Sequence, residues 1–449
     1  MCLLKPNYKH MKKSLILVSL MMFTSLLQAQ NPIVPAGVYI ADLSAHQWKD
    51  GKMYVYGSRD ESPDYYCSWS YDVLSSSDLK TWNRQENSFA SKGANDQVFY
   101  GDYFLYAPDC QYANGMYYLY YCLASGNSTE GVATSKSPTG PFVNGTNIKV
   151  FGHNEIDPCV FIDDDGQAYY IWGQFTAKMA KMKPNMMEID STTIKDNIVT
   201  EKEHFFHEGG YMVKRNGIYY FIYAHMGRAG RPTCIGYATS HSPMGPFKYG
   251  GVIIDNDHCD PGCWNNHGSI AEFNGKWYVF YHRSTHASNT MRKACVEPIT
   301  FNADGSINEV EMTTQGAGEP LLATRELDAA RACLLYGNVR VNAFAKDNEV
   351  LSAFRNGDAA AYKYLNFNTE IDSFEVKAAP GEKEITIDVT IDNSWGNSIG
   401  RINIPGNGNG TLMNTFTCKI QRVKGIHAVW LRFYGDGGDL VKIDSFMFR

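Results

Sequence analysis

A short hydrophobic pattern recurs five times in the N-terminal part of the chain. Each copy begins with Asn-Gly or Asp-Gly and continues into a stretch dominated by aromatic and β-branched side chains. These dipeptides favour type I′ hairpin turns, because both turn residues need positive φ, and the residues after them are typical of strands. The five glycines, spaced by 64, 51, 51 and 58 residues, are Gly51, Gly115, Gly166, Gly217 and Gly275. Each interval has room for four short antiparallel strands, so the pattern predicts an all-β chain with a five-bladed β-propeller over residues 31–320.

Polar residues interrupt this pattern at nearly fixed distances before the turns. Asp42, Asp157 and Glu208 each lie eight residues before the Asn or Asp of their own turn. His267 lies seven residues before its turn, and Asp109 lies five before. If the strand that enters each hairpin is the innermost of its blade, these side chains converge near the propeller axis. A lone acid beside a turn is usually a cap or a solvated loop residue, but three acids at one offset indicate a site.

Three carboxylates in an aromatic-lined funnel suit the hydrolysis of glycosides. One carboxylic acid protonates the leaving oxygen, and a second carboxylate attacks the sugar or activates a water molecule. A third acid nearby raises the pKa of the proton donor and helps to keep it protonated. Aromatic residues make up 13% of the chain, and the faces of Tyr and Trp rings pack well against the C–H faces of sugars.

The segments around these residues resemble glycoside hydrolase family 43. The resemblance rests on Ala41-Asp42, Tyr106-Ala107-Pro108-Asp109, Ile156-Asp157-Pro158, His207-Glu208-Gly209-Gly210, His267-Gly268-Ser269 and Tyr281-His282-Arg283. The segment Ser77–Trp82 fits the family as well. These segments follow one another in the family's order. The resemblance implies a five-bladed propeller that cleaves arabinose-, xylose- or sometimes galactose-containing glycans with inversion.

The same resemblance implies a role for each residue. Asp42 would be the general base and Glu208 the general acid, while Asp157 would tune the pKa of Glu208 and orient it. His267 would lie on the axis, where it would contact the substrate and hold a metal such as Ca²⁺ directly or through water. Arg283 would contact the substrate or pair with a catalytic acid. No cofactor is required for this chemistry, and the ion implied is a structural Ca²⁺ near the axis.

Two departures from the family pattern leave the sugar open. Leu43 follows Asp42 where the family usually has proline, and Tyr106, the remaining substrate-binding candidate, replaces a common tryptophan. The leading interpretation is an inverting hydrolase that releases arabinose or xylose from plant polysaccharides or oligosaccharides. The alternatives are a galactan-directed hydrolase of the same family and a non-catalytic carbohydrate-binding propeller. A fructan-cleaving propeller is disfavoured, because the first-blade segment Ile40–Ser44 lacks its Trp-x-Asn-Asp-Pro-like motif.

A second domain is expected after residue 320. Short alternating strands such as Ile385–Ile391 and Gly-rich turns predict a jelly-roll-like β-sandwich over residues 336–449. A linker over residues 321–335 precedes it, with a short helix expected over residues 326–335. The sandwich resembles a family 6 carbohydrate-binding module, although Ala353 and Lys442 stand where that module has an aromatic residue and a ligand-contacting Asn. Two roles therefore stay open for it: binding sugar and bracing the propeller.

The N-terminus predicts export from the cytoplasm. Lys12 and Lys13 precede an apolar run from Leu15 to Leu27, which is typical of a signal peptide over residues 1–30 and too short for a comfortable membrane span. Met11 resembles a natural start, so residues 1–10 are interpreted as an extension from an upstream start codon. We therefore expect a periplasmic or extracellular protein. For the closely spaced Cys259 and Cys263, a local disulfide, two free thiols and a zinc site stay open.

The charge of the chain narrows the range of partners. The formal net charge is −6 at pH 7, and the isoelectric point is about 6.1. An acidic balance of this kind argues against nucleic acid or an anionic membrane as the main partner. The hydrophobic share of 44% supplies enough apolar material for a large core. The expected partner is the plant polysaccharide or oligosaccharide that the family resemblance implies.

Overall fold

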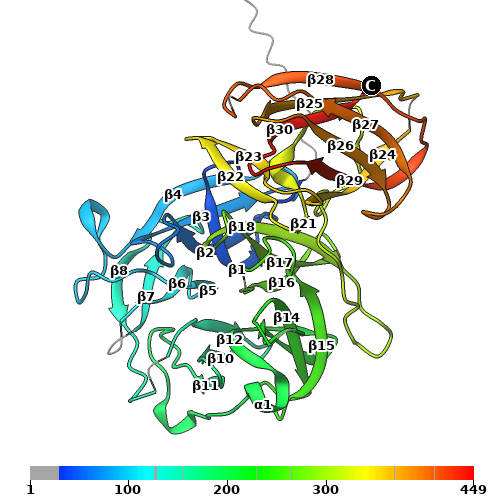
Figure 1. Cartoon of the computed structure of the whole chain (residues 1–449). Coiled ribbons are helices and arrows are strands. Elements are labelled where there is room, and N and C mark those ends of the chain that lie inside the picture. Colours follow the sequence, from blue (N-terminus) through cyan, green and yellow to red (C-terminus); the bar gives the residue numbers. More distant parts are fainter. Residues whose placement is uncertain are drawn as a thin grey trace, which may run out of the picture.

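The computed structural model describes residues 30–449 apart from 126–128, 154, 229, 264, 369 and 409. Within these residues, thirty β-strands are joined by loops, short 3₁₀ turns and a single four-residue α-helix, α1 (Glu201–His204). The prediction of an all-β chain is therefore confirmed (Figure 1). Apart from its last residue, the predicted signal peptide lies outside the described part of the chain. None of the described helices is long and apolar enough to cross a membrane.

The described strands before residue 300 form five antiparallel sheets that follow one another along the chain. The first sheet contains β1 (Tyr39–Gln47), β2 (Met53–Asp60), β3 (Ser70–Ser76) and β4 (Asn83–Ala90), and the second contains β5 (Asp109–Ala113), β6 (Met116–Cys122), β7 (Glu130–Ser135) and β8 (Val143–Asn147). The third contains β9 (Cys159–Ile162), β10 (Ala168–Trp172) and β11 (Lys178–Lys181). The fourth contains β12 (Phe206–Arg215), β13 (Ile218–His225), β14 (Cys234–Ser240) and β15 (Lys248–Asp255), and the fifth contains β16 (Ser269–Phe273), β17 (Lys276–Thr285) and β18 (Ser288–Ile299). Two 3₁₀ turns, η1 (Gly93–Asn95) and η2 (Ser191–Thr193), lie in the connecting loops.

The five repeated hairpins use two kinds of turn. At Asn114-Gly115, Asn216-Gly217 and Asn274-Gly275 both residues have positive φ, as a type I′ turn requires. At Gly51 and Gly166 the glycine has positive φ, but the aspartate before it does not. The type I′ prediction is therefore confirmed for the Asn-Gly pairs and wrong for the Asp-Gly pairs. The latter have a single left-handed glycine, as in longer hairpin loops.

The first strands of the five sheets lie around a common centre. β1 contacts β5, β5 contacts β9, β9 contacts β12, and β12 contacts β16. β16 in turn contacts β1, so the contacts between first strands return to their starting point. Figure 1 shows the five sheets arranged around this centre. The acids that precede the hairpins lie on or next to these first strands, which brings together residues far apart in the sequence.

The C-terminal part is a β-sandwich of two six-stranded sheets. One sheet contains β19 (Leu321–Leu322), β21 (Leu334–Tyr336), β24 (Ala359–Phe367), β26 (Ile385–Ile391), β27 (Ser398–Ile404) and β29 (Gly425–Gly435). The other contains β20 (Leu327–Asp328), β22 (Arg340–Ala345), β23 (Asn348–Ala353), β25 (Ser373–Pro380), β28 (Asn414–Lys419) and β30 (Val441–Phe448). A core that includes Phe374, Ile387, Leu431 and Phe446 fills the space between them.

The segment over residues 321–335 is part of the sandwich sheets. β19 and β21 pair with β24, and β20 pairs with β30. The helix expected over residues 326–335 is absent there, and a single 3₁₀ turn, η3 (Ala329–Arg331), takes its place. Asp328 caps this turn by accepting a hydrogen bond from the backbone N of Ala330. Leu327 and Leu335 are buried by pairing into the two sheets, and this tertiary burial outweighs the helix propensity of the alanines.

The cysteines of the described chain are free thiols. Nine of the ten are buried, and Cys418 in β28 is partly exposed. Burial raises the pKa of the Cys259 thiol well above its ordinary value, and it raises that of Cys263 to about 12. Both thiols are therefore protonated at neutral pH. Of the alternatives left open for this loop, two free thiols is the one that the structure has.

Candidate active site

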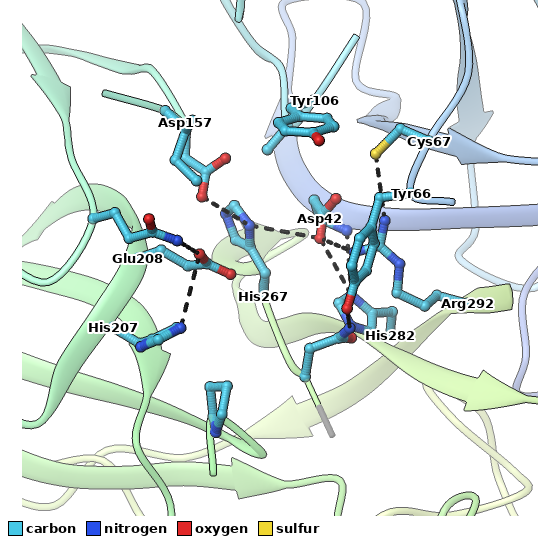
Figure 2. A pocket seen from close by; sticks show the side chains of 15 residues that line it. Asp42, Tyr66, Cys67, Tyr106, Asp157, His207, Glu208, His267, His282 and Arg292 are labelled. Atoms are coloured by element: carbon cyan, nitrogen blue, oxygen red, sulfur yellow. Dashed lines mark hydrogen bonds and ion pairs between the residues drawn. The ribbon is translucent and has the colours of Figure 1, made fainter. Parts of the chain in front are cut away.

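A cavity of about 260 Å³ opens where the first strands of the five sheets meet (Figure 2). Asp42, Asp157 and Glu208, from the first, third and fourth sheet regions, line it together with Tyr106 and His267. Five of the six residues predicted for the site are therefore brought together. The other lining residues are Tyr66, Cys67, Ala107, Ile156, Gln174, His207, Pro232, Asn265, His282 and Arg292.

The backbone leaves the regular strand conformation at each of the three acids. Asp42 lies in a bulge of β1 and has a φ of 56°, and Asp157, just before β9, has a φ of 61°. In β12 the pairing with β13 shifts on both sides of Glu208, and the positive φ falls on Gly209 at 67°. A Cβ at Gly209 would lie 2.5 Å from Nε2 of His267, so any other residue would have to displace the buried ring and adopt a strained backbone. Left-handed residues and bulges of this kind redirect side chains at functional sites.

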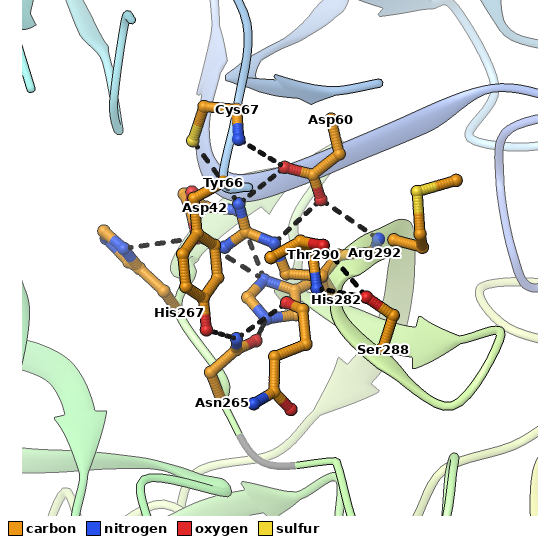
Figure 3. A network of polar contacts seen from close by, with 12 residues as sticks. Asp42, Asp60, Tyr66, Cys67, Asn265, His267, His282, Ser288, Thr290 and Arg292 are labelled. Atoms are coloured by element: carbon orange, nitrogen blue, oxygen red, sulfur yellow. Dashed lines mark hydrogen bonds and ion pairs between the residues drawn. The ribbon is translucent and has the colours of Figure 1, made fainter. Parts of the chain in front are cut away.

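Asp42 is held as an ionised carboxylate. Nη1 of Arg292 donates to Oδ1 of Asp42 at 2.7 Å, while its Nε and Nη2 donate to Asp60 at 2.8 Å each (Figure 3). Nδ1 of His267 and Nδ1 of His282 lie 3.6 Å and 3.7 Å from the same oxygen. Burial by itself would raise the pKa of Asp42, but Arg292 and, less strongly, the two histidines outweigh it and lower that pKa to about 2.

His282 links the backbone of Asp42 to the cavity wall. Its Nδ1 accepts from the backbone N of Asp42 at 3.3 Å, and its Nε2 lies 2.5 Å from Oδ1 of Asn265. Burial lowers the pKa of His282 to about 3, so the ring is neutral at pH 7 and donates from Nε2. Nδ2 of Asn265 in turn donates to the hydroxyl of Tyr66 at 3.1 Å. This chain of hydrogen bonds orients the Asp42 side of the cavity.

Asp157 and Glu208 form the opposite side of the cavity. Asp157 is 6% exposed, and its Oδ2 lies 3.8 Å from Nδ1 of His267. Burial, with the nearby charges of Glu208 and Asp42, raises the pKa of Asp157 well above its ordinary value. The side chain of Glu208 is more open, at 23% exposed, and its Oε2 accepts from Nε2 of Gln174 at 2.8 Å. The two carboxyl groups therefore lie close enough to influence each other, and their repulsion disfavours ionisation of both at once.

Arg283 does not belong to the cavity, which corrects its predicted role. It is 3% exposed and donates to the hydroxyl of Tyr281, to Glu297 and to the carbonyl of Thr313. The arginine that pairs with a predicted site carboxylate, Asp42, is Arg292.

The register of the last sheet explains the difference between the two arginines. In the pairing of β17 with β18, Arg283 lies opposite Lys293, whereas Arg292 lies opposite Ser284. Side chains alternate along a strand, so these two pairs are on opposite faces of the sheet. The face with His282 and Arg292 lines the cavity.

The lining residues that were not predicted differ in whether the amino-acid sequence gives any indication of them. Arg292 and Lys293 are adjacent charges between Met291 and the apolar run Ala294–Val296, which is a detectable anomaly for a buried strand. Gln174 and Asn265 lie in loops and carry no comparable signal. Asn265 is buried and Gln174 is partly buried, and the sheets around them set these locations.

The donor set near His267 does not fit a directly bound Ca²⁺ ion. Calcium takes six to eight oxygen ligands, whereas the nearest charged atoms to Nδ1 of His267 are one oxygen each of Asp42 and Asp157. In the described part of the chain, no group of three or more His, Cys, Asp or Glu side chains is arranged to hold a metal ion.

The fold and the cavity define a class of enzyme. An ionised carboxylate held by an arginine, facing a more open carboxyl group across a cavity, is the arrangement that glycoside hydrolases use. The family model described as glycosyl hydrolases family 43 matches residues 29–307. The chain belongs to this family and is a glycoside hydrolase. The model for the carbohydrate binding module of family 6 matches residues 336–449.

Individual relatives agree with this classification. A protein from Thermoclostridium stercorarium named xylosidase/arabinosidase is 31% identical over an alignment of 487 positions. The alignment covers 92% of this chain and 98% of that protein. A similar crystal structure is that of a family 43 β-xylosidase/α-arabinofuranosidase from a compost microbial metagenome, in a calcium-free form in complex with xylotriose. Its sequence is 30% identical, and the match covers 63% of this chain and 97% of that chain at a TM-score of 0.54. A family 43 arabinoxylan arabinofuranohydrolase from Bacillus subtilis, at 24% identity and a TM-score of 0.54, shares the fold over 93% of this chain and 97% of that one.

Proposed function

We propose that the enzyme releases terminal arabinose or xylose residues from plant polysaccharides or oligosaccharides, with inversion at the anomeric carbon. The observation that carries the proposal is the ionised Asp42 on one side of the cavity, with Glu208 on the other. The names of the relatives, xylosidase/arabinosidase and β-xylosidase/α-arabinofuranosidase, support the pentose specificity. The volume of about 260 Å³ lies just below the usual range for ligand pockets and favours a single terminal sugar.

The proposed reaction takes place in one displacement. Glu208 donates a proton to the glycosidic oxygen as the bond from that oxygen to the anomeric carbon breaks. Asp42 accepts a proton from a water molecule, whose oxygen forms the new bond on the opposite face of the sugar. The protons balance, because one leaves Glu208 and one arrives at Asp42. Two carboxyl groups and water supply every transfer, so the reaction requires no cofactor.

The five sheets are proposed to be the blades of a five-bladed propeller. Support comes from the five repeated hairpins and from the contacts between first strands, which run from β1 through β5, β9, β12 and β16 and back to β1. A structural Ca²⁺ ion near the axis stays a prediction of the family resemblance.

Export from the cytoplasm is part of the proposal as well. The apolar run from Leu15 to Leu27 supports it, because such a run after two lysines is typical of a signal peptide. N-terminal sequencing of the protein from the culture fluid or periplasm tests this part. A chain that still begins at Met1 or Met11 in the cytoplasmic fraction would contradict it.

A substrate series with product analysis tests the function. The series contains aryl α-L-arabinofuranoside, aryl β-D-xyloside, aryl β-D-galactoside, and arabinoxylan and xylan oligosaccharides. We expect release of free pentose from chain ends, and proton NMR of the first-formed sugar should show the inverted anomer. Inversion also requires the carboxyl groups of Asp42 and Glu208 to be roughly 6.5–9.5 Å apart. A retained configuration would exclude Asp42 as the base, and galactose release without pentose release would overturn the sugar assignment.

A further inference from the structure

The last sheet of the catalytic domain connects the cavity to the sandwich. His282 in β17 and Arg292 in β18 line the cavity. Lys293 follows Arg292, and its Nζ forms an ion pair with the carboxylate of Glu349. Glu349 lies in β23, a strand of the sandwich. One residue step along β18 therefore separates a contact inside the cavity from a contact between the two domains.

Glu349 also bonds to the strand that carries Asp42. The hydroxyl of Tyr39 donates to Oε1 of Glu349 at 2.7 Å, and Tyr39 precedes Asp42 in β1. Nζ of Lys293 lies 5.1 Å from the centre of the Tyr39 ring and donates to the carbonyl of Pro35 at 3.1 Å. Lys293 is 3% exposed and Glu349 is 4% exposed. One buried carboxylate of the sandwich thus holds β1 and β18 together.

A second contact from the sandwich reaches another part of the cavity wall. Nε of Arg340 lies 3.1 Å from Oδ1 of Asp260, and its Nη2 donates to the carbonyl of Pro261 at 2.8 Å. Asp260 is 1% exposed and belongs to the loop between β15 and β16. The same loop carries Asn265 and His267, which line the cavity. The sandwich therefore contacts the elements that carry the base, its arginine and one of its histidines.

We propose that Glu349 is a positioning residue for the glycosidase reaction: by joining Tyr39 and Lys293 it fixes β1 against β18, and so fixes Asp42 against Arg292. The sandwich then supports catalysis from behind the active site, whether or not it binds carbohydrate. The role in turnover rests on the proposed function of Asp42 as the base. The geometric part, the spacing of Asp42 and Arg292, stands apart from that function.

The direction in which the pKa of Asp42 moves when Glu349 is replaced distinguishes a positioning role from a simple effect of charge. The titratable and charged groups that act on Asp42 are Arg292, His267, His282, Asp60, Asp157, Tyr66 and Cys67. If Glu349 acted only through its charge, removing that negative charge would lower the pKa of Asp42. If Glu349 holds Arg292 in place, its removal lengthens the contact to Asp42, and the pKa of the buried carboxyl rises.

The test is Glu349→Gln in the full chain. We expect kcat to fall about tenfold with a nearly unchanged KM, since a small misplacement of catalytic groups costs turnover rather than binding. The acid limb of the kcat/KM profile lies near pH 2 in the unaltered enzyme and should move to higher pH, measured from about pH 1.5 to about pH 8. An unchanged kcat with an unchanged limb, or a limb that moves down, would overturn the proposal.

Glu311→Gln is the matched control. Oε2 of Glu311, a residue of the catalytic domain, accepts from Nζ of Lys363 in β24 at 2.5 Å, so this pair also joins the two domains. Neither residue lines the cavity. The control should keep kcat and the acid limb, whatever its effect on the melting temperature. An equal loss of kcat in both variants would show that any weakened domain contact lowers activity, which contradicts a specific role for Glu349.

Two further measurements test the proposal if Glu349→Gln does not fold or if the enzyme cleaves no pentoside. If Glu349→Gln does not fold, Tyr39→Phe removes one hydrogen bond and leaves the ion pair, and it should move the limb in the same direction by a smaller amount. If the enzyme cleaves no pentoside, the proposed function fails, but carbon-13 NMR of labelled aspartate still reports the Asp42 titration, assigned with Asp42→Asn. A pKa of Asp42 that is unchanged or lowered in Glu349→Gln, or in Tyr39→Phe where Glu349→Gln does not fold, overturns the inference.

Discussion

Nη1 of Arg292 lies 2.7 Å from Oδ1 of Asp42, and the side chains are 4% and 9% exposed. The remaining donors of the same guanidinium bind Asp60, so Arg292 is a fixed positive charge beside a buried carboxylate. A buried carboxyl without such a partner would take up a proton. This contact therefore makes Asp42 suited to accept a proton during hydrolysis and unsuited to donate one.

Replacing Arg292 should make the base titrate at higher pH. Arg292→Lys keeps a positive charge but loses the planar fork that binds Asp42 and Asp60 together. We expect kcat/KM to fall by about tenfold or more and its acid limb to move up from the region set by a pKa of about 2. The pH dependence of kcat/KM checks this, and a limb that stays in place would show that Arg292 does not control Asp42.

The same contact affects stability in acid. The folded pKa of Asp42 lies below its ordinary value of 3.8, so its contribution to stability is present above about pH 4 and is lost as the pH falls toward about 2. Arg292→Lys should reduce this contribution. Thermal unfolding of the two proteins should therefore differ most near neutral pH and converge in strong acid.

Glu208→Gln should remove the proton donor and leave the rest of the site intact. Hydrolysis of natural oligosaccharides should fall by about 10²–10⁴-fold. The loss should be smaller for a nitrophenyl glycoside, whose leaving group needs little protonation. Steady-state kinetics on both substrates make the comparison. Equal losses on the two would argue against Glu208 as the acid.

Phe175 is predicted to contact the sugar that leaves. It follows Gln174, the hydrogen-bond partner of Glu208, and its ring packs edge-on against His207, which lines the cavity. The ring is 51% exposed, and the leaving group must lie on the side of Glu208. Phe175→Ala should lower kcat/KM on oligosaccharides about three- to tenfold and change methyl glycosides little.

Phe205 provides the control for this substitution. Like Phe175 it is an exposed phenylalanine with positive φ, at 46% exposed and a φ of 60°. It packs on His225 and Tyr249, which do not line the cavity. Phe205→Ala should leave the ratio of oligosaccharide to methyl glycoside activity unchanged. A fall of the same size in both variants would contradict an aglycone contact at Phe175.

The sandwich is predicted to bind carbohydrate weakly, if at all, through its loops. The loop cavity, about 410 Å³ in volume, has Ala353 and Lys442 in its lining, and Phe354 is its one aromatic residue. Affinity gels with xylan or arabinan, run with the full chain carrying Glu208→Gln, test this. Phe354→Ala should not change the mobility. Clear retardation that Phe354→Ala abolishes would show that the loops bind sugar. Trp395 lies outside this cavity and is 81% exposed, so retardation that is lost in Trp395→Ala would place the binding site on another face.

The repeat made much of the site predictable from sequence. Asp42, Asp157 and Glu208 occupy the same offset before their turns, and each repeat folds into a sheet whose first strand lies at the centre. Equal offsets thus become proximity in space. The arginine was not predictable in this way, because Arg283 and Arg292 differ in the face they occupy. Side chains alternate with a period of two, so a pattern that does not fix the register cannot choose between them.

The segment before residue 336 shows a different limit. Its alanines favour a helix, and a short window of sequence contains nothing against one. The strands that it joins, β24 and β30, come from residues 359 and 441 onward, and pairing with them is a non-local contact. Local propensity carries no information on such pairing. The same reasoning applies to Lys293 and Glu349, whose partnership depends on how the two domains pack.

The left-handed backbone at Asp42 and Asp157 restricts what these positions can become. Asn and Gly tolerate this conformation, whereas alanine and β-branched residues are strained in it. Each replacement of aspartate by Asn or Gly is also a single-nucleotide change. Drift or directed evolution of this scaffold should therefore pass through Asn or Gly at both positions, giving folded proteins without the charge. A non-catalytic sugar-binding descendant is thus only one mutation away from the enzyme.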